Sequence, residues 1–157
     1  LSTEQFMESI DYLRELILAT DLANHFRILK DLKNLTSENI IENQRLLLSM
    51  IITCCDLNDQ IKSWDTVYRV AELVYTEFFT QGDLERQMGM SPNLMFDRKK
   101  ANVPKLQIEF LDGVIIPTYK IFTSIFPETL SFLEIIHVNR EHWLELLEKE
   151  KNECRKC

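Results

Sequence analysis

The chain has 157 residues, of which 45% are hydrophobic and 27% are charged, a composition typical of a folded, water-soluble domain. Three glycines and four prolines are far fewer than the turns of a β-sandwich or barrel require, so an all-α fold is expected. The net charge of −7 provides no basic surface for phosphate backbones, which argues against nucleic acid as a partner.

Membrane and secretion signals are also missing from the sequence. The longest uncharged apolar run, at residues 46–55, is too short to cross a bilayer, so no transmembrane segment is expected. The first residues carry Glu4 and Glu8 and lack the basic start and apolar block of a secretory signal. A cytoplasmic location is therefore the default, with peripheral membrane association left open.

The four cysteines fit a reducing compartment. Cys54 and Cys55 are neighbours in an apolar stretch and cannot join distant segments, so both are predicted to be small core residues. Cys154 and Cys157 form a single C-x-x-C without a second pair or a nearby histidine to complete a zinc tetrahedron. We expect them to lie in a reduced tail, with a metal, redox or lipidation role as the alternative.

Hydrophobic periodicity predicts about five long helices. The first covers residues 2–33, because Ser2 and Gln5 can form a capping box and apolar side chains then recur at helical spacing, at Phe6, Ile10, Leu13, Leu16 and Ile17. The second covers 37–57 and starts near Ser37. Ser63 caps the third, which Gly82 can close; its apolar positions are Val67, Val70, Ala71, Val74 and Phe78.

The second half of the chain begins with a predicted loop at 89–104 that carries one short helix. The fourth helix has Pro104 in its first turn and continues to Ile121, with a bend or interruption at Pro117. Pro127 starts the fifth helix, and residues 148–157 are a charged tail that we expect to fray. The predicted architecture is a compact multi-helix bundle, in which ligand sites lie between facing helices.

Two aspartates occupy positions where apolar helix faces are expected. Asp56 directly follows the apolar residues 51–55, and Asp21 lies between apolar neighbours. Burying an unpaired carboxylate costs several kcal/mol, so a buried aspartate needs a metal, an arginine or amide donors. The alternative is that both aspartates face water or pair locally.

Gln107 and Phe110 lie three residues apart, so on a helix an amide and a ring share one face and could contact a flat heteroaromatic ring. The alternative is a surface glutamine beside a core phenylalanine. The three histidines, His25, His137 and His142, lack H-E-x-x-H spacing, and no triad or glycine-rich phosphate loop is present. These residues alone predict a helical domain and do not indicate an activity.

The order of several longer motifs is more specific. They are ILATDLA at 17–23, TCCDL at 53–57, AELVYTEFFTQGD at 71–83, DR at 97–98, PKLQIEF at 104–110 and NREHW at 139–143. In this order and spacing they resemble the catalytic domain of class I 3′,5′-cyclic-nucleotide phosphodiesterases over nearly the whole chain. FRILKDL at 26–32 and DLNDQ at 56–60 look most like the cGMP-stimulated, dual-specificity subfamily.

The resemblance implies a role for several residues. Asp56 would be one ligand of a tightly bound zinc, in a two-metal site that also holds magnesium. Gln107 would hydrogen-bond the purine edge, Phe110 would stack on the purine, and Val74 would form the opposite jaw. The other substrate-binding positions that the resemblance implies are Thr20, Asp21, Leu22, Leu57, Asp59, Gln60, Phe78 and Met95.

The family's H-N-x-x-H and H-D motifs, which supply the general-acid histidine and the other metal ligands, do not occur in the sequence. The resemblance therefore implies that residues 1–147 are the C-terminal part of a catalytic domain, followed by the charged tail 148–157. Such a domain would hydrolyse the cyclic nucleotides cAMP and/or cGMP to 5′-monophosphates in signal transduction, joined to the rest of its own catalytic domain. We expect the chain alone to be inactive and prone to aggregation. The alternative is a non-catalytic short form that binds intact subunits; a homodimer is left open.

Overall fold

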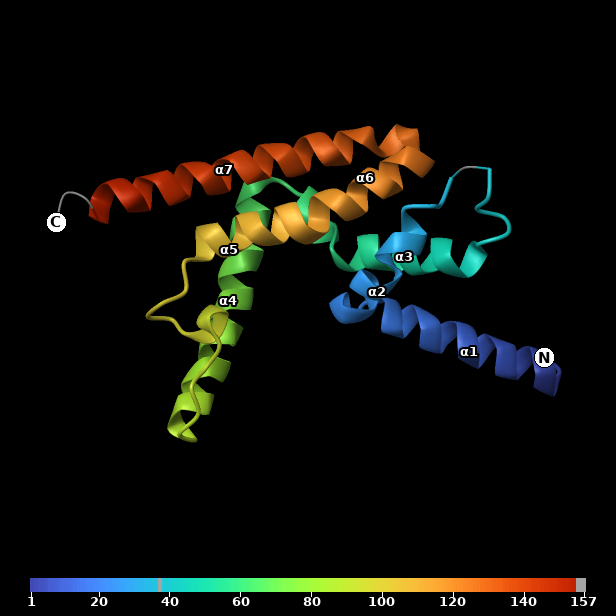
Figure 1. Ribbon diagram of the computed structural model, residues 1–157, viewed down its shortest axis with the longest axis horizontal. Helices are drawn as coiled ribbons and strands as arrows, with labels where there is room; N and C mark the ends of the chain where they lie inside the picture. Colours follow the sequence, from blue (N-terminus) through green and yellow to red (C-terminus); the bar gives the residue numbers. More distant parts are fainter. Residues whose placement is uncertain (37, 155–157) are drawn as a thin grey trace. The chain divides into compact units, whose positions relative to one another are not determined.

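The computed structural model describes residues 1–36 and 38–154, and none of these residues lies in a β-strand (Figure 1). The predicted all-α fold class is therefore confirmed. Backbone contacts divide the chain into two compact units. Unit 1 comprises Leu1–Asn58 and Pro117–Leu133, and unit 2 comprises Asp59–Ile116 and Glu134–Cys157.

Unit 1 contains the complete helices α1 (Thr3–Ala19), α2 (Leu22–Leu32) and α3 (Gln44–Asp56). It also contains α6 (Ile116–Ile125) except its first residue, and the 3₁₀ turn η4 (Pro127–Thr129) that follows. The capping box at Ser2 and Gln5 is confirmed. The single helix predicted over 2–33 is wrong, because the chain breaks between α1 and α2. Asp21 causes this break by capping α2, where its carboxylate accepts a hydrogen bond from the Ala23 N–H at 2.9 Å.

The second helix starts later than predicted. Ser37, the predicted start, lies outside the described residues, and residues 38–43 form turns before α3 begins at Gln44. The Asn39 side chain accepts a hydrogen bond from the Thr36 N–H at 2.8 Å and donates to the Asn34 carbonyl at 2.9 Å. Such side-chain bonds to the backbone compete with helix formation.

Buried polar contacts hold the helices of unit 1 together. The Thr53 hydroxyl donates to the Ala19 carbonyl, and the Tyr119 hydroxyl donates to the Cys54 carbonyl, each at 3.0 Å. His25 Nε2 lies 3.0 Å from the Thr118 hydroxyl. Of the two adjacent cysteines, only Cys54 is buried as predicted, because Cys55 points to the exposed side of α3.

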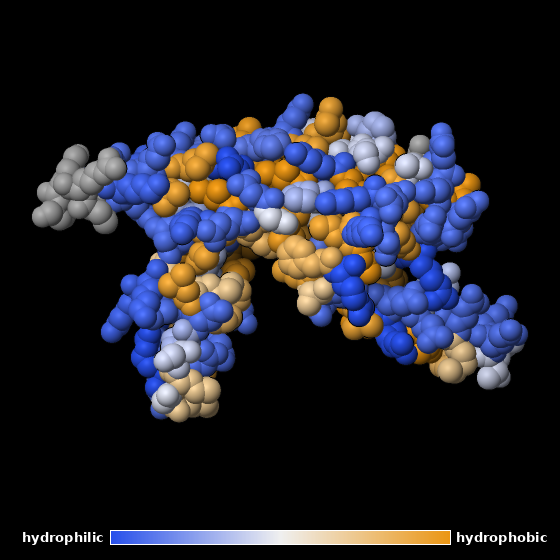
Figure 2. Space-filling model, in the orientation of Figure 1, coloured by the Kyte–Doolittle hydropathy of each residue, from blue (hydrophilic) through white to orange (hydrophobic). Residues whose placement is uncertain are grey.

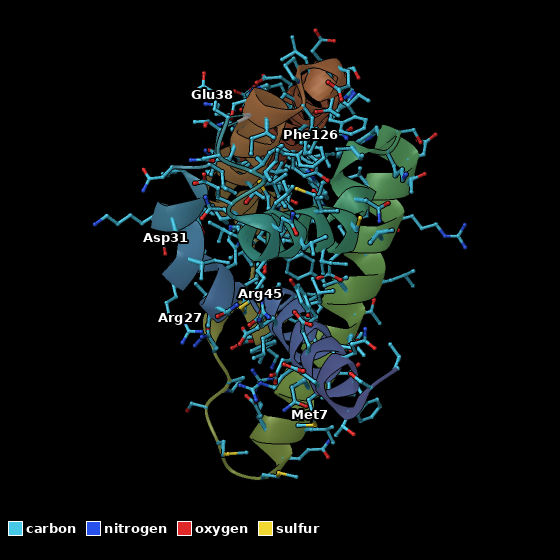
Figure 3. All side chains as sticks on the ribbon, turned by 90° about the vertical axis from the view of Figure 1, so that its right-hand side faces the viewer. Met7, Arg27, Asp31, Glu38, Arg45 and Phe126 are labelled. Carbon is cyan, nitrogen blue, oxygen red and sulfur yellow. The ribbon has the colours of Figure 1, made fainter. Side chains whose placement is uncertain are left out.

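A cation also joins α3 to α1. The Arg45 guanidinium lies 4.2 Å from the centre of the Tyr12 ring and 2.6 Å from the Glu15 carboxylate. Figure 3 labels the Arg45 side chain. Because both Arg45 and Glu15 are largely exposed, this pair contributes little to stability.

Unit 2 is built around two long helices, α4 (Trp64–Gln87) and α7 (Leu130–Cys154), the first turn of α7 belonging to unit 1. Between them in the chain come three short elements: the 3₁₀ turn η2 (Leu94–Phe96), α5 (Val103–Phe110) and the π-helical turn η3 (Leu111–Ile115). A 3₁₀ turn, η1 (Asn58–Ile61), precedes α4. The predicted short helix within the 89–104 loop is confirmed by η2.

Gly82 lies inside α4 and does not end it, contrary to the prediction. A Cβ atom at this position would lie 2.0 Å from the Phe96 carbonyl oxygen, so only glycine lets η2 pack this closely on α4. The helix continues to Gln87, and the chain turns at Gly89, whose φ of 78° is the left-handed conformation expected after a helix end.

The predicted interruption near Pro117 is confirmed. Pro117 has no N–H to donate, and the turn just before it is π-helical, so that α5, η3 and α6 follow one another without a loop. Residues 148–154 belong to α7, which continues to Cys154, and the fraying of this charged end stays a prediction. The Asn102 side chain donates to the Glu150 carboxylate at 2.7 Å and holds this end. Cys157 lies outside the described residues, so the role of the Cys154 and Cys157 pair stays a prediction.

Figure 2 shows both hydrophilic and hydrophobic side chains on the surface of the molecule. None of the helices in 1–36 and 38–154 combines the length and the apolar character needed to span a bilayer.

Candidate purine site

The centre of the candidate site in unit 2 is the Gln107 side chain on α5. Gln107 is buried, and its side-chain amide lies within hydrogen-bonding reach of the Tyr75 hydroxyl of α4. Burial raises the pKa of Tyr75, and the bond from Gln107 opposes part of that rise. Gln107 Oε1 has no hydrogen-bond partner among the described residues. One end of the amide is thus held, and its oxygen is left as an open acceptor.

The predicted jaws of the site lie on the same two helices. Phe110 follows Gln107 by three residues on α5 and is half-buried, and Val74 on α4 is 38% exposed. Both apolar side chains therefore retain surface for a ligand. Phe78 is one turn after Val74, and its ring lies 5.7 Å from the Tyr75 ring.

Phe78 also lines an open cavity of about 450 Å³, with Phe96 as a neighbour at 5.0 Å between ring centres. Met95 is half-buried in η2 beside Phe96. Gln107, Phe110 and Val74 do not line this cavity. Their convergence on one cleft thus stays a prediction.

The variable pocket positions Asp59 and Gln60 lie in η1. The Gln60 amide nitrogen donates to the Asp59 carboxylate at 2.6 Å, and Gln60 is buried. Asn139, from the NREHW motif on α7, donates from its amide nitrogen to the Gln60 carbonyl at 3.2 Å and to the Lys62 carbonyl at 3.0 Å. The motif therefore fixes the backbone of η1, a role that sequence reasoning missed.

In unit 1, the remaining candidates flank the contact between Ala19 and Thr53. Thr20 caps the end of α1, Asp21 caps the start of α2, and Leu22 is half-buried as the first residue of α2. The local pairing left open for Asp21 is thus confirmed.

Asp56 is the last residue of α3, and Leu57 follows as its C-cap. The Asp56 carboxylate is exposed, so the prediction that it is buried is wrong. Thr53 and Cys54 form the buried face at this end of α3, and Asp56 lies on the other side of the helix. Within the described residues, no three His, Cys, Asp or Glu side chains come close enough to hold a metal ion. Asp56 and its surroundings therefore do not fit a complete zinc or magnesium centre.

The DR motif at 97–98 attaches the loop to α4. Asp97 is buried and accepts hydrogen bonds from the Lys99 N–H at 3.0 Å and from Arg86 at 2.9 Å. These bonds, the backbone one first, hold the pKa of Asp97 below its ordinary value. Arg98 pairs with Asp83 of α4 at 2.6 Å. The motif is therefore structural in unit 2.

Comparison with known protein families decides the assignment. The family model described as 3′5′-cyclic nucleotide phosphodiesterase matches residues 1–136. This chain belongs to the 3′,5′-cyclic nucleotide phosphodiesterase family. The predicted family is thus confirmed, and the Gln107 and Phe110 motif lies within the matched residues.

Individual phosphodiesterases give the same result. The chain is 35% identical to the dual 3′,5′-cyclic-AMP and -GMP phosphodiesterase 11A of Takifugu rubripes, with 98% of the chain and 18% of the relative covered. It is 35% identical to the dual phosphodiesterase 11 of Drosophila melanogaster (93% and 10%) and to the cGMP-specific phosphodiesterase of Drosophila virilis (95% and 18%). The chain thus spans less than a fifth of the length of these relatives. Two of them are dual-specificity enzymes, as predicted from the subfamily resemblance.

Tyr75 is a residue of the candidate site that sequence reasoning did not single out. Its burial could have been predicted from spacing, because Val67, Ala71 and Tyr75 recur every four residues and so lie on one face of α4. All three are buried. The predicted stripe of α4 included the buried Val67 and Ala71, but it continued to the 38% exposed Val74 and omitted the buried Tyr75.

Proposed function

We propose that this chain forms the purine-binding part of a catalytic domain that hydrolyses 3′,5′-cyclic AMP or GMP to the 5′-monophosphate. The observation that carries the proposal is the Gln107 amide, which is buried beside Tyr75 and has no hydrogen-bond partner at Oε1 among the described residues. A buried acceptor without a partner is costly, and a purine edge would satisfy it.

The neighbours of Gln107 support recognition of both purines. Adenine and guanine present opposite donor and acceptor patterns on the edge that distinguishes them, and an amide matches either pattern if it can rotate. The Tyr75 hydroxyl can donate as well as accept, so it can hold the amide in both orientations. We therefore assign a dual specificity, with Phe110 stacking on the base and Val74 on its other face.

Asp56 would contribute one ligand to the metal centre that polarises the cyclic phosphate. In this proposal zinc and magnesium complete their coordination with residues outside the 157, as does the general acid, because the H-N-x-x-H and H-D motifs do not occur here. Thr20, Asp21, Leu22 and Leu57 would lie near the same end of the substrate. The isolated chain is consequently inactive.

A chimaeric enzyme tests the proposal. Residues 1–157 replace the matching segment of the Takifugu rubripes dual phosphodiesterase, and hydrolysis of cAMP and cGMP is measured. We expect activity on both nucleotides. Gln107→Ala should lower kcat/KM by about tenfold to a hundredfold, because the purine loses its hydrogen bonds, and Phe110→Ala should raise KM.

Lys105→Ala is the matched control on α5, since its side chain is exposed and pairs with Glu109 at 3.7 Å. It should leave both kinetic constants unchanged. Gln107→Ala and Phe110→Ala variants with unchanged constants would contradict the purine assignment. Hydrolysis by the isolated chain with added zinc and magnesium would contradict the assignment of the missing ligands.

A second candidate function rests on α1. Phe6, Ile10, Leu13 and Ile17 form an apolar stripe whose side chains are 44–69% exposed. Such a stripe suits either the rest of the same catalytic domain or an intact phosphodiesterase subunit. If the chain is a non-catalytic binding module, it should co-elute with the intact Takifugu rubripes enzyme in size-exclusion chromatography, and Leu13→Ser with Ile17→Ser should abolish co-elution.

A further inference from the structure

Unit 2 contains a second cavity, which shares only Tyr75 with the residues that the proposed function uses. It lies between α4, the start of α5 and α7, and its volume is about 320 Å³. Ligand pockets in proteins typically have volumes of about 300–1,000 Å³, so this one suits a small molecule. Gln107, Phe110, Val74 and Phe78 are not among its lining residues.

Aromatic rings form much of its wall. Tyr68 and Trp143 lie nearly parallel, with ring centres 5.8 Å apart, and the Trp64 ring supports Trp143 edge-on at 4.9 Å. Tyr75 and Phe79 line the cavity further along α4, with their ring centres 5.9 Å apart. These contacts restrict the rotamers of the rings, so the wall is formed before a ligand binds.

The charged residues that line the cavity within 1–36 and 38–154 are acidic. They are Glu72 from α4 and Glu150 from α7. Glu150 accepts the Asn102 amide bond described above, and neither carboxylate forms an ion pair with the described residues. The carboxylates therefore remain available to a positively charged ligand.

Two cations beside the lining residues have partners. The Arg98 guanidinium lies over the Phe79 ring at 5.7 Å and is bound by Asp83 at 2.6 Å. Lys105, next to the lining residue Pro104, pairs with Glu109. The Phe79 ring thus already makes a cation–π contact in the structure, which shows that this part of the wall can attract a positive charge.

We infer that this cavity is a binding site for an organic cation that carries an aromatic group, such as a protonated arylalkylamine. The aromatic group would lie between the rings of Tyr68, Tyr75, Phe79 and Trp143, and the ammonium group would face Glu72 and Glu150. Aromatic faces and carboxylates both attract a cation, and both reject an anion of the same size. The inference does not depend on the proposed function.

The test uses three probes of similar size: phenethylammonium, 2-phenylethanol and 3-phenylpropionate. The chain has two tryptophans, Trp64 and Trp143, so the indole N–H region of its ¹H–¹⁵N spectrum holds two signals, one from a lining residue. We expect phenethylammonium to shift the Trp143 signal in a saturable manner. The alcohol should bind about three- to tenfold more weakly, and the propionate should cause no shift.

Glu72→Gln and Glu150→Gln remove the two charges and keep the shape of the lining. Each should weaken phenethylammonium binding about three- to tenfold, with little effect on the alcohol. Glu77→Gln is the matched control, because Glu77 is also exposed on α4 but does not line this cavity. It should leave the affinity unchanged.

Equal affinity for the cation and the alcohol would overturn the inference, as would an unshifted Trp143 signal at saturating phenethylammonium. Equal weakening by Glu77→Gln and by the two lining variants would also overturn it, since net charge alone would then explain the binding. Neither result bears on purine binding, which the chimaeric enzyme tests separately.

Discussion

Helices α1 and α4 carry the same kind of apolar pattern, and only one of them is covered. On α4 the stripe of Val67, Ala71 and Tyr75 is at most 5% exposed, whereas the stripe on α1 is 44–69% exposed. Periodicity identifies the face of a helix that is suited to burial, but it does not show which element covers that face. The two stripes should therefore differ strongly in their sensitivity to mutation.

The largest loss of stability is expected at the close contact between α4 and η2. Gly82→Ala would place a Cβ against the Phe96 carbonyl, so η2 must move away from α4. We expect unit 2 to lose about 3 kcal/mol of unfolding free energy. Both tryptophans lie in unit 2, so urea unfolding followed by tryptophan fluorescence measures this loss. An unchanged urea midpoint would mean that η2 does not pack on α4.

A pair of truncations compares the two stripes directly. Val67→Ala removes fully buried methyl groups and should cost about 2 kcal/mol. Ile17→Ala removes a larger but 69% exposed side chain and should change the free energy of unfolding by less than about 0.5 kcal/mol. Both are measured by urea unfolding with circular dichroism. A comparable loss in the two variants would show that α1 is covered in solution, for example by a second copy.

The third expected effect concerns the buried interior of unit 1, the unit in which α1 carries the exposed apolar stripe. Burial lowers the pKa of His25 from its ordinary value of 6.5. The unfolded chain then binds the proton more tightly than the folded chain. Stability should therefore be fully present above about pH 6.5 and should fall below it, by at most about 1.4 kcal/mol per pH unit.

Urea midpoints measured between about pH 5 and 7 by circular dichroism should show this slope. His25→Gln, which removes the titrating group, should flatten it. An NMR titration in which the His25 imidazole has its ordinary pKa or a higher one would contradict the packing of His25 against Thr118.

The smallest effect is expected at the surface of unit 2. Arg140 holds Asp112 through two parallel hydrogen bonds of 2.7 and 2.8 Å, and these bonds lower the pKa of Asp112. Asp112 is 45% exposed, so Asp112→Asn should cost only about 0.5–1 kcal/mol, and less at high salt. Glu141→Gln, next to the same arginine at 3.6 Å, is the control and should have no effect on the urea midpoint.

Sequence reasoning predicted the elements whose limits depend on local chemistry. The capping box at Ser2, the interruption near Pro117 and the short helix at η2 are confirmed, because each depends on neighbouring residues alone. The break at Asp21 and the continuation of α4 through Gly82 were missed. At Asp21 the apolar period continued across the cap, and at Gly82 the reason is a contact with Phe96, 14 residues away in the sequence.

For the candidate site, the order of the motifs was enough to identify the family. It did not predict how side chains pack around each site residue. Asp56 follows an apolar run and is nevertheless exposed, because the last residues of α3 point in different directions. Tyr75 looked like one aromatic residue among several. Its bond to Gln107 joins two helices and has no local signature in the sequence.

The three glycines of the chain should differ in the substitutions that they accept during random mutagenesis. Position 82 should accept no other amino acid, since every side chain begins with a Cβ. At Gly89 there is open space around the missing Cβ but a φ of 78°, so asparagine should be recovered most often. Gly113 has open space and an ordinary φ, so alanine should be enriched there. Sequencing of a selected library would therefore distinguish a glycine required by space from one required by backbone conformation.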